Sequence, residues 1–300
     1  MKKINKLIIS VIIIVLLGVI HTSIVEASST KINTPKNVKA SVSGTTNVKV
    51  KWSKVKNAKR YTIYRATSKK GKYKKVGTSK TTSFVNKNLA RGKTYYYKVV
   101  ANGKSSNSKK SNYSKIKILT KKQVLAKIRN TLKDKKWVNK NIKIKDLQGY
   151  SQTLYFGKIK NKELIVVEAV SEQAGRYQMF LVGYNNGKIV AASATDGDMN
   201  WNSGAPFVDL NKSISCDNAL HHGYEYAKYY KIVNVKFKDL DCFVTNEPEM
   251  SDDTFFEIND KKVSKKKYKE GLKKYDKYNF ISLESKGHKL TNKNIDKYVK

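Results

Sequence analysis

The sequence predicts a multidomain protein in which an all-β two-sheet sandwich precedes an α+β domain with an antiparallel sheet. Three observations lead to this class. From residue 34 to 119, apolar residues alternate with lysines in seven short segments that turn residues separate. Helical spacing begins at Thr120, where Thr120-Lys-Lys-Gln123 has the spacing of a capping box. Farther on, strand-like runs are joined by hairpin turns such as Asn185-Asn186-Gly187, which indicates antiparallel pairing.

Residues 1–27 have the organisation of a secretory signal peptide. Three lysines precede an apolar run over residues 7–20, and Val25 and Ala27 suit cleavage after the run. The run is short for a bilayer span, which needs roughly 20 apolar residues, although an uncleaved anchor is the alternative. We therefore expect an exported protein, extracellular or wall-associated, with residues 28–33 as a polar connector and no stable membrane insertion after cleavage.

Seven strands are expected in the sandwich, residues 34–119. Val48, Val50 and Trp52 alternate with lysines, as in a half-buried strand whose polar face points to water. The remaining strands are expected at Val38 to Ala40, Tyr61 to Ile63, Tyr73 to Val76, Phe84 to Val85, Tyr95 to Val99 and Ile116 to Ile118.

Four groups of residues in this segment resemble a fibronectin type III domain. They are Pro35-Lys-Asn-Val38, Trp52, Ala58-Lys-Arg-Tyr61-Thr-Ile63 and Leu89-x-x-Gly92-x-x-Tyr95-x-x-x-Val99. The resemblance implies a spacer or binding module without catalysis, in which the hydroxyl of Tyr95 bonds back to the backbone. Arg91 stands where the family usually has proline, and the absence of Arg-Gly-Asp between the last two strands gives no indication of integrin-type adhesion.

The formal net charge of +39 is distributed unevenly along the chain. Residues 34–119 hold 24 Lys and Arg and no Asp or Glu, whereas residues 120–300 hold 34 basic and 22 acidic residues. Such a surface attracts polyanions and repels itself. The sequence predicts a polyanion-binding surface in which lysines and tyrosines interleave, and its cations are Lys69, Lys70, Lys72, Lys74, Lys75, Arg91, Lys93, Lys98, Lys109 and Lys110.

The expected partner is an anionic cell-wall polymer or an acidic glycan. Nucleic acid is not expected, because the chain carries an export signal and no helix-turn-helix, zinc-finger or RNA-binding signature. A solvated basic sandwich without a dedicated ligand is the structural alternative. The sequence predicts no cofactor and leaves the oligomeric state open.

Residues 120–300 are expected to combine helices with an antiparallel sheet. Ser215 is expected to cap a helix over residues 216–230, and residues 232–244 to form one long strand. Further elements are expected as a helix after Thr120, strands at 154–159, 163–170, 177–184 and 189–194, a hairpin at 255–263, and helices capped by Ser264 and Thr291.

Parts of this second segment resemble uncharacterised C-terminal regions of secreted proteins from low-GC Gram-positive bacteria. The likeness lies in Ile165-Val-Val-Glu168-Ala-x-Ser-Glu172-Gln, Phe180-Leu-Val and Leu290-Thr-Asn-Lys-Asn-Ile-Asp-Lys-Tyr298. It implies no mechanism.

Several polar groups have the composition of a metal site or a disulfide. Asp196, Asp198 and Asn200 place oxygen ligands at the first, third and fifth positions of a loop, as a hard cation such as Ca²⁺ prefers, although the rest of an EF-hand is missing. An ordinary polar loop is the alternative. Cys216 and Cys242 could form one disulfide or remain two separate thiols.

Two other arrangements would support hydrolysis. Glu168 and Glu172, four apart on an expected strand, could act with Asp196 or Asp198 as paired carboxylates. His221 shares a helical face with Glu225 and lies near Cys216, but no nucleophile signature surrounds them. We therefore assign no catalytic residue and expect a non-catalytic extracellular binding protein. A secreted cell-wall or glycan hydrolase with the sandwich as accessory module is the alternative.

Overall fold

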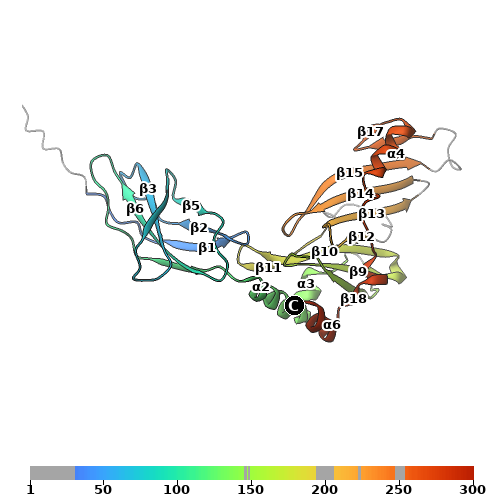
Figure 1. The fold of residues 1–300 in the computed structure, drawn as a ribbon, viewed down its shortest axis with the longest axis horizontal. Helices are drawn as coiled ribbons and strands as arrows, with labels where there is room; N and C mark the ends of the chain where they lie inside the picture. The colour runs from blue at the N-terminus through green and yellow to red at the C-terminus, as the bar shows by residue number, and fades with distance from the viewer. Residues whose placement is uncertain (1–30, 145–146, 148, 194–205, 222–223, 247–253) are drawn as a thin grey trace, which may run out of the picture. The chain divides into compact units, whose positions relative to one another are not determined.

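The computed structural model describes residues 31–144, 147, 149–193, 206–221, 224–246 and 254–300 (Figure 1). The chain divides into two compact units. The first consists of residues 1–39, 50–84 and 96–114, and the second of residues 40–49, 85–95 and 115–300. The domain boundary predicted at residues 119–121 stays a prediction. Within the described ranges, no helix has both the length and the apolar character needed to cross a bilayer.

Seven strands between residues 39 and 117 form two sheets, and all seven were predicted from the sequence. The smaller sheet has the order β1-β2-β5, with β1 at Lys39–Ser43, β2 at Asn47–Lys51 and β5 at Ser83–Asn86. The larger has the order β4-β3-β6-β7, with β3 at Arg60–Ala66, β4 at Lys74–Ser79, β6 at Thr94–Asn102 and β7 at Ser114–Lys117 (Figure 1).

The strand arrangement is fibronectin type III-like, and a corner tyrosine accompanies it. The Tyr95 hydroxyl accepts a hydrogen bond from the backbone N–H of Ala90 at 3.0 Å. This is the contact that the resemblance implied for Tyr95.

Alternation along the strands of the four-stranded sheet separates a buried face from a wetter one. Ile63, Tyr97 and Val99 are completely enclosed, whereas the intervening Tyr64 and Lys98 are only partly covered. Burial of the first set stabilises the folded chain by roughly 25 cal/mol per Å² of apolar surface removed from water. The second set is left at the surface for contacts outside the core.

A five-stranded antiparallel sheet lies in the second unit, with the order β11-β10-β9-β8-β18 (Figure 1). Every residue of its central strand β9 is buried, as in a strand covered on both faces. The bounds are β8 at Thr153–Lys158, β9 at Leu164–Ser171, β10 at Arg176–Asn185, β11 at Lys188–Ser193 and β18 at His288–Lys289, with a 3₁₀ turn at Glu172–Ala174 after β9.

The predicted hairpin at Asn185-Asn186-Gly187 joins β10 to β11. Asn186 and Gly187 both have positive φ, at 49° and 84°, as a tight two-residue hairpin turn requires.

A six-stranded antiparallel sheet completes the second unit, with the order β12-β13-β14-β15-β16-β17 (Figure 1). The bounds are β12 at Pro206–Asp209, β13 at Ile214–His221, β14 at Tyr224–Ile232, β15 at Phe237–Asn246, β16 at Phe256–Ile258 and β17 at Lys261–Lys262.

The helices of this unit are few and short. They are α2 at Lys121–Lys133, α3 at Lys135–Asn141, α4 at Lys265–Lys273, α5 at Leu283–Lys286 and α6 at Asn292–Tyr298. Three of the predicted caps are confirmed: Thr120 and Gln123 form both bonds of a capping box, and the hydroxyls of Ser264 and Thr291 each accept a bond from the first helical turn. Because antiparallel sheet dominates, the α+β class assigned from the sequence stays a prediction.

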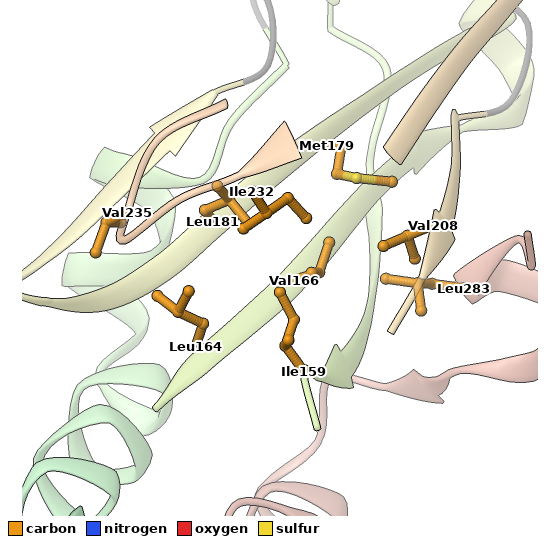
Figure 2. Close-up of a cluster of buried hydrophobic side chains, with 9 residues drawn as sticks. All are labelled: Ile159, Leu164, Val166, Met179, Leu181, Val208, Ile232, Val235 and Leu283. Atoms are coloured by element: carbon orange, nitrogen blue, oxygen red, sulfur yellow. The ribbon is translucent and has the colours of Figure 1, made fainter. Parts of the chain in front are cut away.

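Side chains from the five- and six-stranded sheets share one apolar core (Figure 2). Val166, Met179 and Leu181 come from the first sheet and Val208 and Ile232 from the second. All five are essentially enclosed, so this core fixes how the two sheets lie within the unit. Ile159, Leu164, Val235 and Leu283 complete the cluster.

Aromatic side chains build a second core beside the six-stranded sheet. The rings of Tyr229 and Tyr275 stack with centroids 3.6 Å apart, and Phe243 meets Tyr229 edge to face. Tyr275 also donates a hydrogen bond to Asp241 Oδ2 at 2.7 Å, which satisfies its partly buried hydroxyl.

Two predicted elements are wrong in this region. Residues 216–221 and 224–230 lie in strands β13 and β14 instead of a helix, with Cys216 opposite Tyr229 and Ala219 opposite Tyr226. Aromatic residues favour such pleated surfaces, and the side chain of Ser215 is buried in a strand and caps nothing. The predicted long strand over 232–244 is likewise interrupted, because a turn with Asn234 at φ 56° separates β14 from β15.

Candidate polyanion-binding face

The wetter face of the four-stranded sheet gathers tyrosines and lysines. Tyr64 of β3 lies directly opposite Lys98 of β6 and Lys75 of β4. Residues that face each other across strands project on the same side of a sheet, and so does Tyr96, two residues before Lys98. The loop residues Tyr73 and Tyr113 extend this set.

Ring contacts tie the loops to the strands. The ammonium of Lys98 lies 4.7 Å from the ring centre of Tyr73, and that of Lys110 lies 4.7 Å from the ring centre of Tyr64. Lys69 lies 5.6 Å from the ring centre of Tyr113. We call these eight residues the lysine–tyrosine face: Lys69, Lys75, Lys98, Lys110, Tyr64, Tyr73, Tyr96 and Tyr113.

Contacts within the face hold three of its tyrosines in place. Tyr96 and Tyr113 meet edge to face with centroids 5.5 Å apart, and the Tyr73 hydroxyl donates to the backbone oxygen of Lys69 at 3.2 Å. Partial burial, followed by the neighbouring Tyr113 and Tyr96, raises the pKa of Tyr73 above its ordinary value of 10.0. The phenol of Tyr73 therefore stays neutral at physiological pH. The tyrosines of the face offer flat apolar rings with polar edges.

Two serines, Ser108 and Ser111, hold the segment that contains Lys110 against strand β6. Ser111 and Ser108 each exchange hydrogen bonds with β6, since the N–H of Ser111 donates to Val99 O and the Ser111 hydroxyl accepts from the Val99 N–H, both at 2.9 Å. Ser108 pairs with Ala101 in the same manner. The segment between them, Lys109 and Lys110, is therefore held along the strand while both lysines stay exposed.

No carboxylate can neutralise this face from within its own stretch of chain. Residues 27–133 contain no Asp or Glu, so a lysine of the first unit has no acidic partner among them. Each cation–ring contact stabilises by about 0.5–1 kcal/mol at an exposed site. The rings thus hold the ammonium groups of Lys69, Lys98 and Lys110 in place, and their charges are not neutralised by a carboxylate of this stretch of chain.

The structure brings together only part of the predicted cation set. Lys69, Lys75, Lys98 and Lys110 belong to the lysine–tyrosine face, and Lys70, Lys72 and Lys109 are exposed neighbours of it in the chain. Lys74 pairs with Arg65, one residue along from the Tyr64–Lys75 pair, and so projects from the opposite side of the sheet. Lys93 is exposed but belongs to the second unit.

Arg91 also belongs to the second unit and already has a partner there. Its guanidinium contacts Glu163 Oε2 at 2.8 Å and the backbone oxygen of Leu119 at 3.4 Å. An arginine engaged in this way contributes less to anion binding, because a new anion must compete with Glu163.

Tyr64 is a member of the face that was not predicted from the sequence. Its position directly after the inward-facing Ile63 in β3 was the signal that could have identified it.

The candidate carboxylates for hydrolysis do not form an accessible pair among the described positions. Glu168 is fully enclosed on β9, and its Oε2 accepts a hydrogen bond from the Glu284 N–H at 3.0 Å. Glu172 is exposed in the 3₁₀ turn, where its carboxyl group pairs with that of Glu284 and raises the pKa of Glu284, in addition to the larger effect of burial. Asp196, Asp198 and Asn200 lie outside the described residues.

The cysteine and histidine candidates also form no metal site among the described residues. Cys216 is buried, and its thiol donates to Asn218 Oδ1 at 2.8 Å, while Cys242 is partly covered on β15. The two are separate thiols in the structure. His221 ends β13 opposite Tyr224, where the sequence had predicted a helix. Over the ranges that the structure describes, no group of three or more His, Cys, Asp or Glu side chains could hold a metal ion.

Comparison with known proteins gives structural likenesses alone. No family model and no curated protein matches the chain. An Fn3-like protein from Clostridium thermocellum is 24% identical, covers 27% of this chain and 88% of its own length, and has a TM-score of 0.26. The structure titled FN3tt mut is 19% identical over 30% of this chain and 100% of its own, with a TM-score of 0.28.

A third likeness is the fn3 domain of human collagen alpha-1(XX) chain, at 17% identity over 32% of this chain and 93% of its own, with a TM-score of 0.27. TM-scores this low do not assign a fold. The fibronectin type III-like description comes instead from the strand order and from the Tyr95 corner.

Proposed function

We propose that this protein is a non-catalytic extracellular binding protein that associates with anionic cell-wall or surface polymers through its lysine–tyrosine face. One observation carries the proposal. Four lysines and four tyrosines share one side of a sheet within a stretch of chain that contains no carboxylate. The proposal includes export directed by residues 1–27 and a basic fibronectin type III-like module at residues 34–119.

The chemistry of the face suits a polymer with repeated negative charge. Like charges without counter-charges destabilise a folded surface, and a bound polyanion removes that repulsion. Lysines whose ammonium groups lie over rings have already lost part of their rotamer freedom, so less conformational entropy is lost on binding. The rings of Tyr96 and Tyr113 add flat apolar surface between the charges.

The alternative, a secreted hydrolase, has no described observation in its favour. Glu168, one of its proposed acids, is enclosed and bonded to the backbone of α5. Hydrolase activity remains a hypothesis for residues 120–300, and it is tested by measuring the release of soluble fragments from purified cell walls.

The binding proposal is tested with the chain lacking residues 1–27 and purified walls from a Gram-positive bacterium, with and without teichoic acid. We compare the wild type with a variant carrying Lys69→Gln, Lys98→Gln and Lys110→Gln. The matched control carries Lys262→Gln, Lys266→Gln and Lys269→Gln, three exposed lysines of the second unit, and so has the same net charge.

We expect the lysine–tyrosine variant to bind at least roughly tenfold more weakly, because each lost ammonium removes a charge-assisted contact. The control variant should bind nearly as the wild type, and binding should weaken between about 0.1 and 0.5 M salt as screening shortens the reach of the charges. Equal weakening of both variants would show that net charge alone attracts the polymer. Salt-insensitive binding, or binding only to nucleic acid, would overturn the proposal.

A further inference from the structure

A pocket in the second unit supplies a second place for a ligand. It has a volume of about 500 Å³ and lies where three segments of chain meet: the end of β8 with the turn after it, the residues following β12, and residues 279–281. Pockets of a few hundred Å³ are the size that small-molecule ligands use. The pocket includes no residue of the lysine–tyrosine face.

The three segments are fixed to one another by the backbone. The N–H of Lys160 donates to Leu210 O at 2.9 Å, and Val208 and Ile281 exchange two hydrogen bonds of 3.0 and 3.1 Å. The walls of the pocket are therefore built before any ligand arrives, which lowers the entropy lost on binding.

A buried carboxylate holds two of the three asparagines of the pocket in position. Asp209 is 2% exposed; its Oδ1 accepts from the N–H groups of Asn211 and Lys212 at 2.8 and 2.9 Å, and its Oδ2 accepts from the Asn279 N–H at 3.0 Å. Because backbone donors hold this carboxylate, the side-chain amides of Asn211 and Asn279 are not needed for its satisfaction. Asp209 is a positioning residue here, not a part of the lining.

The polar lining consists of donors and amides without any acid. It comprises Lys158, Lys160, Asn161, Asn211 and Asn279. Lys158 donates to the backbone oxygen of Lys300, whereas Lys160 is exposed and makes no ion pair or side-chain hydrogen bond with the described residues. Lys160 is therefore the charge that a ligand would meet, and the amides can both donate to and accept from hydroxyl groups.

The apolar lining comes from Ile159, Leu210 and Ile281. Ile159 belongs to the shared core (Figure 2), so this side of the pocket is rigid. A ligand that matches the whole lining has one anionic group, several hydroxyls and a C–H face. We propose that the pocket binds a monosaccharide-sized polyol carrying one carboxylate or phosphate group.

The pocket stands independently of the lysine–tyrosine face, so the two proposals can fail separately. The test is calorimetric titration of the full chain lacking residues 1–27 with glucuronate, glucose 6-phosphate, glucose, acetate and inorganic phosphate. The first two probes separate the carboxylate from the phosphate source. Glucose lacks the charge, and the last two lack the polyol.

We expect glucuronate or glucose 6-phosphate to bind to one saturable site, and the simple anions and glucose to bind at least about tenfold more weakly. Lys160→Gln should lower the affinity for the charged probe by about five- to tenfold while leaving the affinity for glucose unchanged, because only the charge-assisted contact is lost. Asn279→Ala removes only the amide and keeps the backbone bond to Asp209, and it should weaken the charged probe as well.

Lys188→Gln, an exposed lysine on β11, is the control with the same change in charge, and it should bind as the wild type. The lysine–tyrosine variant should also keep full affinity for the sugar. The proposal is overturned if no probe saturates, if inorganic phosphate binds as tightly as glucose 6-phosphate, or if Lys160→Gln and Lys188→Gln have the same effect.

Discussion

The carboxylate of Glu168 accepts a hydrogen bond from the backbone N–H of Glu284 at 3.0 Å, across 116 residues of chain. Glu168 lies in the middle of the fully buried strand β9, and Glu284 lies in the first turn of α5. The N-cap of α5, Ser282, makes no side-chain capping bond, so Glu168 supplies the acceptor that the helix start needs. Burial nevertheless dominates, and it raises the pKa of Glu168 from 4.5 to about 7.

This raised pKa predicts a specific pH dependence of stability. Below about pH 4.5 Glu168 is protonated in both the folded and the unfolded chain, so its burial does not lower the free energy of unfolding through ionisation. As the pH rises towards 7, the unfolded chain releases the proton and the folded chain keeps it, so the free energy of unfolding falls. The loss levels off above pH 7, at roughly 3 kcal/mol for a shift of this size.

Glu168→Gln should remove that dependence. Urea unfolding followed from pH 4 to pH 8 should give a flatter profile for the variant than for the wild type, with the difference growing between pH 4.5 and 7. Glu270→Gln, at an exposed position of α4, should keep the wild-type slope. Parallel profiles for wild type and Glu168→Gln would show that Glu168 ionises as freely in the folded chain as in the unfolded one.

The corner contact of Tyr95 predicts a measurable loss of stability. Tyr95→Phe keeps the buried ring and removes the oxygen that accepts from the Ala90 N–H at 3.0 Å. An unsatisfied donor of this kind costs about 1–3 kcal/mol. Tyr113→Phe removes a hydroxyl from a ring that is 39% exposed and should change the free energy of unfolding little. Equal effects of the two substitutions in thermal unfolding would contradict the structural role of the corner.

The capping box at α2 predicts a smaller and separable effect. Thr120 Oγ1 accepts from the Gln123 N–H at 3.1 Å, and Gln123 Oε1 accepts from the Thr120 N–H at 3.0 Å. Thr120→Ala should lower the free energy of unfolding by about 1 kcal/mol, and Thr120→Ser should restore most of it because serine caps equally well. If serine and alanine behave alike in chemical denaturation, the cap does not stabilise α2.

Local signals in the sequence were sufficient for the first seven strands, for the caps at Thr120, Ser264 and Thr291, and for the hairpin at Asn186 and Gly187. In each case the physical cause lies within a few residues, such as a period of two or a turn that needs positive φ. Residues 216–230 show where this fails. Their helical appearance came from one capping serine, whereas their strand pairing depends on β12 and β15, which flank the hairpin in the sheet.

The types of residue in the candidate site could be predicted from the sequence, but the particular residues that share the face could not. The lysines and tyrosines of residues 69–75 and 96–113 are visible in the sequence, but the pairing of Tyr64 with Lys98 depends on the register between β3 and β6. A shift of one residue would turn Lys98 to the other face. The same dependence removed Lys74 from the face, because it pairs with Arg65.

Strand register also decides between the two states that the sequence left open for Cys216 and Cys242. Cys216 pairs with Tyr229 of β14, and Cys242 pairs with the adjacent residue Lys228. Neighbouring residues of a strand project to opposite faces, so the two thiols point away from each other. They also lie on strands two apart in the sheet, about 10 Å, whereas a disulfide needs Cα atoms within about 7 Å.

We therefore predict that the purified protein contains two thiols and that a reductant leaves its melting temperature unchanged. The intact mass should not rise by two hydrogens on reduction, and a loop-closing disulfide would instead have stabilised the fold by about 3 kcal/mol. Burial raises the pKa of Cys242, so alkylation should be slow until the chain unfolds. Cys216→Ser should destabilise more than Cys242→Ser, because Cys216 is the more deeply buried. If both substitutions lowered the stability equally, and a reductant lowered the stability of the wild type by the same amount, Cys216 and Cys242 would instead form a disulfide.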